Sequence, residues 1–514
     1  MPLTEEQKVY QELLSKLDDR YWRLNNLYWI KDKQGNVVQF KMNWAQEELY
    51  RNMHTRNVIL KARQLGFTTF IDIFILDACL FNSAMQGGVI ADNKDNAEEI
   101  FKNKVQFAYN RLPEELRKRR GLMEDSKSKI SLTNSSAIRV GTSMRSGTMQ
   151  ILHISELGKI SAKYPEKAKE IISGSIEAVP LDGLVFVEST AEGKGGVFYN
   201  MCDQAQKLFD SNAKLTNLDY KFHFFPWWKN PEYSMDEYYD NISEEDNAYF
   251  DDIEVKVGEK ITVGQRNWYI KKRQGLKLAS SQMTDEDMKK EYPSTPEEAF
   301  ESAIEGAVFK KEFALLRKQD RIRTVPYDPN LPVNTFWDLG WGDYTTIWFH
   351  QYFQGEHRFI DYYENHHENT THYVQYLQTK GYVYGKHYLP HDVESKHMAT
   401  GQSTADICRS LGLQIEIVKA SDLITGINAT RNKLPTVYFD KTKCAKGLEH
   451  LEGYRYEWDE KLAVYKREPL HDEHSHASDS MRYWAVGWKE PVVSAGFKQA
   501  APVRRHPLTG QIMR

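Results

Sequence analysis

The sequence has few cysteines, and none of them lies close to another. The four are spread along the chain: Cys79, Cys202, Cys408 and Cys444. The absence of a C-x-x-C pair argues against a disulfide framework or a zinc ribbon, and it predicts free thiols in a reducing compartment.

Long apolar runs are lacking as well. The longest candidate, 70–81, is interrupted by Asp72 and Asp77. A membrane-spanning helix needs about 20 consecutive apolar residues, and the first residues do not show the pattern of a secretion signal. We therefore expect a cytosolic protein that does not associate with membranes.

The chain also lacks a strong charge of one sign. Its formal net charge is −4 over 514 residues, so any attraction to nucleic acid must come from local basic patches. Two basic runs stand out: Arg111 with Arg117, Lys118, Arg119 and Arg120, and Lys271, Lys272 and Arg273 with Lys277. Each run taken alone is more simply explained as a solvated helix face.

What the sequence does contain is two successive αβ patterns, in a chain long enough for roughly two to four domains. Residues 1–55 are polar, aromatic and helix-rich. Short apolar strands then alternate with helices: strands at 58–60, 88–91, 150–154 and 184–187, helices at 68–81 and 93–112, and a hairpin at 130–140 that turns at Asn134-Ser135. This alternation predicts a parallel, doubly wound sheet. We assign 56–325 to this domain, with a less regular lid or linker part at about 205–325.

The second pattern begins at Asn334. Three strands with hairpin-length gaps come first (335–338, 345–351 and 357–363), and antiparallel pairing is expected for them. A helix at 370–380, a strand at 388–391, a helix at 403–411 and a strand at 414–418 follow, then further helix, and a last helix at 475–488. This order is typical of a ribonuclease-H-like (RuvC-like) fold, which we place at 326–490. A basic tail, 491–514, ends the chain.

The first domain contains a candidate phosphate loop in VILKARQLGFTTF, residues 58–70. A strand followed by a loop and the start of a helix is the arrangement that a nucleoside triphosphate site requires, because backbone amides at a helix N-terminus bind phosphate. The pattern departs from G-x-x-x-x-G-K-[ST] at two positions, with Phe67 in place of the lysine and Lys61 in place of the first glycine. The candidate ligands of ATP are Lys61, Arg63, Gly66, Thr68 and Thr69, with Thr68 also a ligand of Mg²⁺.

Two further strand ends carry suitable groups. QILHISE, 150–156, ends in Ser155 and Glu156, where a Walker B strand ends in Asp-Glu. Glu156 is thus the candidate water-activating base, although a strand-end carboxylate in a salt bridge would look the same. VESTAEG, 187–193, places Ser189 and Thr190 at the carboxyl edge of the sheet, where ligands bind in open αβ folds.

The second domain offers three carboxylates at matching positions of its fold: Asp338, Asp392 and Asp479. Adjacent carboxylates repel one another unless a cation neutralises them, and Mg²⁺ or Mn²⁺ prefers oxygen ligands. Two such ions would activate a water for phosphodiester cleavage. Asp343 is a further candidate ligand, and Asp472 competes with Asp479. The histidines His471, His474 and His476 fit no zinc pattern, and we expect them to contact phosphate or a metal ligand.

With these motifs together, the chain resembles the large terminase subunit of tailed bacteriophages over nearly its whole length. KARQLGFTT looks like the family's deviant Walker A motif, in which an arginine (here Arg63) is usual, and VESTAEG looks like its coupling motif. Gln46, in NWAQEELY, falls where the family's adenine-reading glutamine lies. EYPSTPEEAF, 291–300, is similar to a stretch before the nuclease domain. The resemblance implies a P-loop (RecA/ASCE-like) ATPase followed by a nuclease.

The resemblance also implies partners and a setting. The subunit would work in the host cytoplasm, as a monomer in solution and as a ring homo-oligomer when docked on the portal protein of a procapsid. ATP hydrolysis would drive double-stranded viral DNA inward, the nuclease would cut concatemers, and a small terminase subunit would select the DNA. The basic tail would dock on the portal, and a disordered terminus is the alternative explanation for it. Two alternatives stay open: a helicase–nuclease of DNA repair or junction resolution, and a non-catalytic scaffold with degenerate sites.

Overall fold

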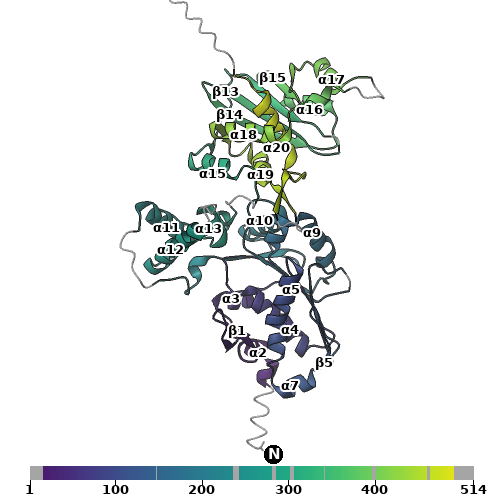
Figure 1. Cartoon of the computed structure of the whole chain (residues 1–514), viewed down its shortest axis with the longest axis vertical. Helices are drawn as coiled ribbons and strands as arrows, with labels where there is room; N and C mark the ends of the chain where they lie inside the picture. The colour runs from purple at the N-terminus through teal and green to yellow at the C-terminus, as the bar shows by residue number, and fades with distance from the viewer. Residues whose placement is uncertain are drawn as a thin grey trace, which may run out of the picture. The chain divides into compact units, whose positions relative to one another are not determined.

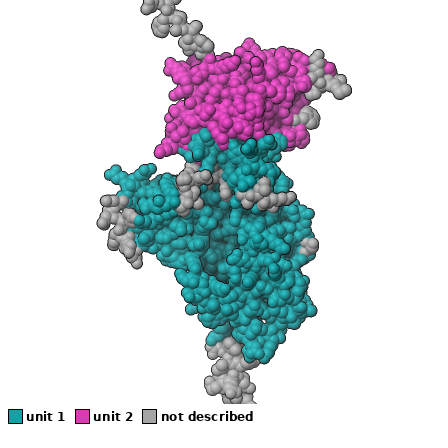
Figure 2. Space-filling model, in the orientation of Figure 1, with its two compact units in different colours: residues 1–314, 448–475 teal, residues 315–447, 476–514 magenta. Residues whose placement is uncertain are grey.

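The computed structural model describes residues 15–145, 147–235, 242–279, 285–300, 306–340, 342–395, 401–459 and 464–490. These residues form two compact units, shown in different colours in Figure 2: unit 1 comprises 1–314 with 448–475, and unit 2 comprises 315–447 with 476–514. The segment 448–475 thus groups with unit 1, which a single contiguous domain over 326–490 does not anticipate. The predicted tail, 491–514, lies outside the described residues.

Unit 1 is built on an eight-stranded sheet of order β10-β3-β9-β8-β4-β7-β6-β5, in which the pairs from β10 to β7 are parallel. The strands are β3 (Arg56–Lys61), β4 (Gln86–Ile90), β5 (Leu122–Asp125), β6 (Lys129–Leu132), β7 (Ala137–Gly141), β8 (Ile151–Ser155), β9 (Leu184–Ser189) and β10 (Tyr220–Phe225). The predicted doubly wound αβ fold is therefore confirmed. Its central strands are buried on both faces and hence read as continuous apolar runs.

Helices cover both faces of this sheet, as Figure 1 shows. On one face α4 (Phe67–Phe81) packs its apolar side chains against the strands, with the rings of Phe74 and Phe186 6.0 Å apart. On the other face Ile160 of α8 (Leu157–Lys163) and Cys202 of α10 (Gly196–Asp210) belong to a second core. Two apolar cores thus hold the sheet between them and fix its strand ends.

The remaining elements of unit 1 surround this frame. They are α2 (Arg20–Asn26), β1 (Trp29–Lys31), β2 (Val37–Gln39), α3 (Trp44–Asn52), α5 (Lys94–Ile100), η1 (Phe101–Gln106), α6 (Phe107–Tyr109), α7 (Glu114–Arg119), α9 (Pro165–Glu170), η2 (Ile171–Ile176), η3 (Trp227–Lys229), α11 (Glu244–Val257), α12 (Val263–Ala279), α13 (Asp285–Glu291), α14 (Pro296–Ala299), β18 (Tyr456–Asp459) and β19 (Val464–Pro469). The hairpin turning at Asn134-Ser135 is confirmed, with Ser135 at φ 66. The helix expected at 93–112 is not uniform, because a π-helical turn occupies 101–106. The edge strand β10 was not anticipated.

Unit 2 contains a seven-stranded sheet of order β11-β17-β14-β13-β12-β15-β16. Its strands are β11 (Ile322–Arg323), β12 (Val333–Asp338), β13 (Thr345–Phe353), β14 (Glu356–Asn365), β15 (Tyr384–Leu389), β16 (Ile415–Ile417) and β17 (Val437–Asp440). The first three long strands are antiparallel, and β15 then pairs in parallel with β12. This arrangement confirms the ribonuclease-H-like order.

The helices of unit 2 include α16 (Thr370–Thr379), η4 (His391–Glu394), α17 (Thr404–Ser410), α18 (Leu423–Lys433) and η5 (Leu434–Thr436). Helices α15 (Lys310–Lys318), α19 (Ala445–Gly453) and α20 (Ser475–Gly487) each run across a unit boundary, and of α20 only Ser475 belongs to unit 1. The last helix, α20, packs on β13, where Trp348 Nε1 donates to the carbonyl oxygen of Ala477 at 2.9 Å. The strand β17 lies in a stretch expected to be helical. Predicted strand 388–391 instead ends at Leu389, because Pro390 opens a short 3-10 turn.

All four cysteines are buried free thiols, as predicted. Among the described residues, every helix is too short or too polar to cross a membrane. The basic runs are partly neutralised: Lys118 pairs with Glu114, Arg273 with Asp246, and Lys277 with Asp285. These pairs favour the solvated-face interpretation of both runs.

Candidate nucleotide and metal sites

The loop between β3 and α4 has the backbone conformation of an anion-binding turn. Gln64 and Gly66 both adopt positive φ, 60 and 78, and α4 begins at the next residue. Loops of this kind turn successive amides toward a bound anion. A Cβ at Gly66 would lie 2.8 Å from Nε2 of Gln46, so glycine is needed for both conformation and space. Phe67 is buried, with its ring 4.6 Å from that of Phe225. The position that usually carries lysine therefore belongs to the core here.

The cation of the site is Lys61, at the end of β3. Its Nζ lies 3.2 Å from Glu156 and 3.1 Å from Glu188, and its side chain is 7% exposed. Burial by itself would lower the pKa of Lys61, but the two carboxylates outweigh it and raise the pKa above its ordinary value. Lys61 is therefore a permanent cation at the base of the loop.

Glu188, at the end of β9, is a functional candidate that the sequence interpretation missed. It is fully buried, and its Oε1 accepts hydrogen bonds from Thr68 Oγ1 (2.7 Å) and Ser155 Oγ (2.9 Å). Burial would raise the pKa of Glu188, yet Lys61 and then His153 hold it well below its usual range. A charged residue inside the apolar strand LVFVES was the signal that could have revealed it.

Behind Glu188 lies a second buried pair. His153 Nε2 is 3.5 Å from Glu188 Oε1, and its Nδ1 is 2.8 Å from Asp72 of α4. Burial opposes protonation of His153, but the hydrogen bond and charge of Asp72 raise its pKa to about 9. Three carboxylates and two cations thus alternate from α4 to the loop, which is how buried charges are tolerated.

Glu156 stands at the start of α8 in a left-handed conformation, φ 58, that is costly for a residue other than glycine. Its side chain is 35% exposed, so it faces solvent while contacting Lys61. Ser189 Oγ lies 3.4 Å from Glu156 Oε2 and accepts the backbone N–H of Gly158. Thr190, directly after β9, is buried, and Thr69 in the first turn of α4 is half-buried. All residues predicted for the nucleotide site except Gln46 thus lie at the end of β3, on the loop after it, on α4, or at the ends of β8 and β9.

Arg63 and Gln46 approach the loop differently. Arg63 is 58% exposed and pairs with Glu291 at 3.2 Å, so its guanidinium is accessible to a ligand. Gln46, on α3, is buried: its Nε2 donates to the carbonyl oxygen of Gly66 (2.8 Å), and its Oε1 accepts from Asn43 N (3.0 Å). In the structure Gln46 therefore braces the loop.

In unit 2, Asp338 ends β12 and faces α20. Its Oδ2 lies 3.2 Å from His476 Nδ1, while Asp479, one helical turn further, receives two hydrogen bonds from Arg482 (3.0 and 2.6 Å). Burial raises the pKa of Asp338 to about 6, with Asp479 adding to the rise and His476 opposing it. A divalent cation would relieve this unfavourable burial of charge, and the oxygen donors suit Mg²⁺ or Mn²⁺.

Asp392 comes from the turn after β15, the strand beside β12. It lines a hollow of about 380 Å³ together with Gly340 and Thr345. The negative charges of Asp338, Asp479 and Asp392 all raise the pKa of Tyr483 on α20, so each of the three lies within electrostatic range of this side chain. Among the described residues, the three carboxylates do not form a group whose ligand atoms lie within 4.8 Å of one another. The three carboxylates would therefore have to move closer together to bind the same ion.

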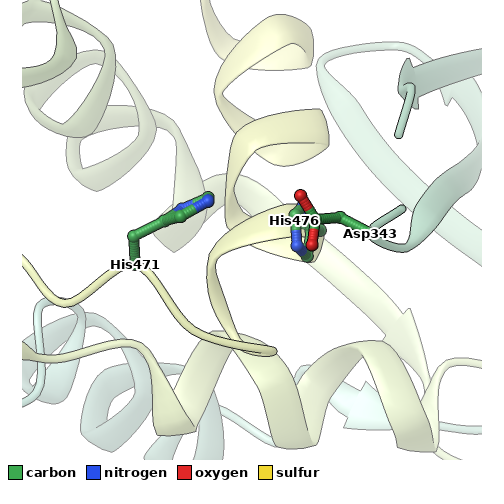
Figure 3. A group of neighbouring side chains, drawn as sticks. All are labelled: Asp343, His471 and His476. Atoms are coloured by element: carbon green, nitrogen blue, oxygen red, sulfur yellow. The ribbon is translucent and has the colours of Figure 1, made fainter. Parts of the chain in front are cut away.

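Asp343 lies on the same side of unit 2. One of its carboxylate oxygens is within 4.8 Å of an imidazole nitrogen of His476 (Figure 3), and its charge raises the pKa of His476. The other candidates fall in unit 1: Asp472 Oδ2 is 3.5 Å from Arg455, and His474 Nδ1 is 3.2 Å from His450. His471, also drawn in Figure 3, is 3.0 Å from Ser475 Oγ. Of the two competing aspartates, Asp479 is thus the neighbour of Asp338.

No protein-family model matches the chain, and no curated protein matches it. Solved structures do match. One is the large terminase of the thermophilic bacteriophage D6E (13% identity, TM-score 0.31, covering 86% of this chain and 98% of that one). Another is the HK97 bacteriophage large terminase (12%, 0.38, 87% and 95%). A third is the ATPase domain of the Thermus phage P74-26 large terminase (16%, 0.32, 50% and 94%).

The chain resembles large terminases.

Proposed function

We propose that the chain is a DNA-packaging motor subunit, an ATPase in unit 1 and a metal-dependent DNA nuclease in unit 2. One observation carries the proposal: in each unit, charged side chains gather where the central strands end. In unit 1, Glu156 and Glu188 pair with the cation Lys61, beside the loop that turns at Gln64 and Gly66. In unit 2 the acids Asp338, Asp392 and Asp479 share one neighbourhood. One chain thus offers groups suited to two different reactions, hydrolysis of a phosphoanhydride and hydrolysis of a phosphodiester.

In the ATPase, Lys61 and the amides around Gly66 would bind the β- and γ-phosphates, and Arg63 would stabilise charge on the γ-phosphate. Glu156 would orient and deprotonate the attacking water. Mg²⁺, held through Thr68 and with Thr69 beside it, would neutralise phosphate charge. Gln46 would support the loop through its hydrogen bond to the carbonyl oxygen of Gly66, and Ser189 and Thr190 would link the nucleotide state to DNA movement.

In the nuclease, Asp338, Asp392 and Asp479 would hold Mg²⁺ or Mn²⁺. Such ions, when bound, activate a water and stabilise the leaving oxygen of a phosphodiester. His476 would fix the orientation of Asp338, as ligand-contacting groups do in other metal sites. Asp343 would act with His476 at the same edge.

The partners follow from this role: double-stranded viral DNA, a portal protein on a procapsid, a small terminase subunit, and copies of the chain in a ring. The setting would be the cytoplasm of an infected host. Tail 491–514 would provide the portal contact.

Two single substitutions test the proposal in the full-length protein. Glu156→Ala should abolish ATP turnover and leave Mn²⁺-dependent plasmid cutting measurable, and Asp338→Ala should do the reverse. Unchanged cutting by Asp338→Ala would refute the nuclease assignment. Unwinding of a forked duplex would favour a helicase–nuclease instead, and absence of both activities in the wild type would favour a non-catalytic scaffold.

A further inference from the structure

The phosphate site of unit 1 lacks one expected group. A Walker B strand ends in an aspartate followed by a glutamate, and the aspartate accepts the loop hydroxyl and supports Mg²⁺. Here β8 ends in Ser155 followed by Glu156. Ser155 has no charge, and its hydroxyl is directed to Glu188, 2.9 Å away. A site that binds a nucleotide with Mg²⁺ would therefore lack the Walker B carboxylate, unless another strand supplies one.

The strand register shows where that carboxylate is. β9 lies between β3 and β8, and Glu188 is the residue directly opposite Ser155 in the parallel pair. On the other side Glu188 is opposite Ile59, two residues before Lys61. Its carboxylate thus occupies the same level of the sheet as the missing aspartate, displaced by one strand.

The contacts of Glu188 match the role of the missing group. The hydroxyl of Thr68, the expected Mg²⁺ ligand, donates to Glu188 Oε1 at 2.7 Å. The other oxygen, Oε2, is buried, and its ion pair with the Lys61 ammonium at 3.1 Å leaves it able to accept a further contact. A buried carboxylate oxygen with spare capacity, beside the loop hydroxyl, is suited to a hydrated cation or to a water that one holds.

The support behind Glu188 gives it a fixed orientation. Asp72 lies one turn after Thr68 on α4, and it holds His153 at 2.8 Å, which in turn faces Glu188. The helix that presents the hydroxyl therefore also carries the far end of the network that orients the carboxylate. A simple counter-ion for Lys61 would not require a hydrogen bond from Thr68.

We propose that Glu188 replaces the aspartate that is absent at position 155, and that it positions Thr68 and the Mg²⁺ of a bound nucleotide. This inference rests on the proposed nucleotide site. It assigns a positioning residue on β9, and it explains how a chain with Ser155 can retain magnesium-dependent chemistry.

Nucleotide binding with and without metal tests the assignment in the full-length protein. A fluorescent ATPγS analogue is titrated in EDTA and in Mg²⁺, and Mn²⁺ affinity in the presence of ATPγS is followed by electron paramagnetic resonance. We expect Glu188→Gln to weaken Mn²⁺ binding about 10- to 100-fold, with a smaller change in the metal-free titration. Glu177→Gln, at an exposed glutamate of unit 1, is the matched control.

A swap makes the test specific. Ser155→Asp combined with Glu188→Ser returns one carboxylate to β8, and it should recover most of the Mn²⁺ affinity that Glu188→Gln loses. If Glu188→Gln does not fold, Thr68→Val against Thr68→Ser carries the test, since only the valine removes the hydroxyl that Glu188 accepts.

Unchanged metal affinity in Glu188→Gln, or in Thr68→Val when Glu188→Gln does not fold, would reduce Glu188 to a buried counter-ion and overturn the inference. A swap that recovers nothing would do the same. A wild type that binds no nucleotide in either condition would instead refute the ATPase proposal, so the two failures can be told apart.

Discussion

The ammonium of Lys61 lies 3.2 Å from the carboxylate of Glu156, so the expected phosphate-binding cation and the expected water-activating base are paired with each other. A γ-phosphate would compete with Glu156 for Lys61. Binding of a triphosphate would thereby release the carboxylate for its work on water. In the proposed ATPase, this pair would couple the binding of substrate to the availability of the base.

Lys61 and Arg63 should therefore differ in what their removal does. Lys61→Ala leaves Glu188 buried without its main cation, and we expect a loss of about 3–5 kcal/mol in the free energy of unfolding, together with loss of ATP binding. Arg63→Ala removes an exposed pair with Glu291, and should cost at most about 1 kcal/mol while lowering kcat. Denaturant titration and ATPase assays measure both. Equal stability losses would show that Lys61 is not the buried charge centre of the site.

Substitution of Gln46 can show whether this residue supports the loop or recognises the adenine base. Both ends of its amide are used, by Gly66 O and Asn43 N. We expect Gln46→Ala to weaken ATP and GTP binding by similar factors, because the loop loses its support. Titrations with both nucleotides measure the ratio. A loss confined to ATP would instead support the adenine-reading role that the resemblance implies.

Much of the fold could be predicted because its signals are local. Buried parallel strands read as apolar runs, the turn at Asn134-Ser135 has turn residues, and three hairpin-spaced strands preceded alternating helices in unit 2. Strand β10, YKFHFF, was missed because it lies in an aromatic, irregular stretch and its partner, β3, is far away in sequence. The same holds for β17, which pairs with β14 across a long connection.

The candidate site was predicted in part for the same reason. Recognisable motifs contain Lys61, Gly66, Thr68 and Glu156. The role of Glu188, in contrast, is apparent only from its contacts in the folded protein. Asp72, His153 and Glu188 each stand inside an apolar element, and burying an unpaired charge is costly. This pattern indicates that the buried charges must pair with one another. Which of them meet depends on the strand order, which local patterns do not specify.

Adjacent residues of one segment contact both loops of the nucleotide site. Lys290 pairs with Glu192 of the VESTAEG loop at 2.5 Å, and Glu291 pairs with Arg63. Because Lys290 and Glu192 are both largely buried, we expect a coupling of about 0.5–3 kcal/mol in a double-mutant cycle of Lys290→Ala and Glu192→Ala. Denaturation of the four proteins measures it. Additive losses would show that the two segments are not energetically linked.

Acid should weaken unit 2 through His387. Burial lowers the pKa of His387 to about 4, below the unfolded value of about 6.5. The folded state then binds fewer protons, so this contribution to stability is present above about pH 6.5 and is lost as the pH falls toward 4, by about 3 kcal/mol in all. His387→Gln cannot titrate. Urea unfolding at about pH 7.5 and about pH 4.5 should show a smaller acid loss in the variant, by about 2–3 kcal/mol, and an equal loss would contradict the assignment to His387.

The two aspartates that sequence spacing left in competition can be separated by cutting assays. Asp479 influences Asp338 electrostatically and lies on α20 beside it, whereas Asp472 lies by Arg455 in unit 1. We expect Asp479→Asn to lower Mn²⁺-dependent plasmid cutting at least about 100-fold, because a ligand carboxylate is lost from a site that needs its charge. Asp472→Asn is the matched control, and its cutting rate should stay within a few-fold of the wild type. His476→Ala should give an intermediate loss, since Asp338 keeps its charge but loses the imidazole that orients it. If Asp472→Asn abolishes cutting and Asp479→Asn does not, then Asp472 is the metal ligand, and the role given to Asp479 on α20 is wrong.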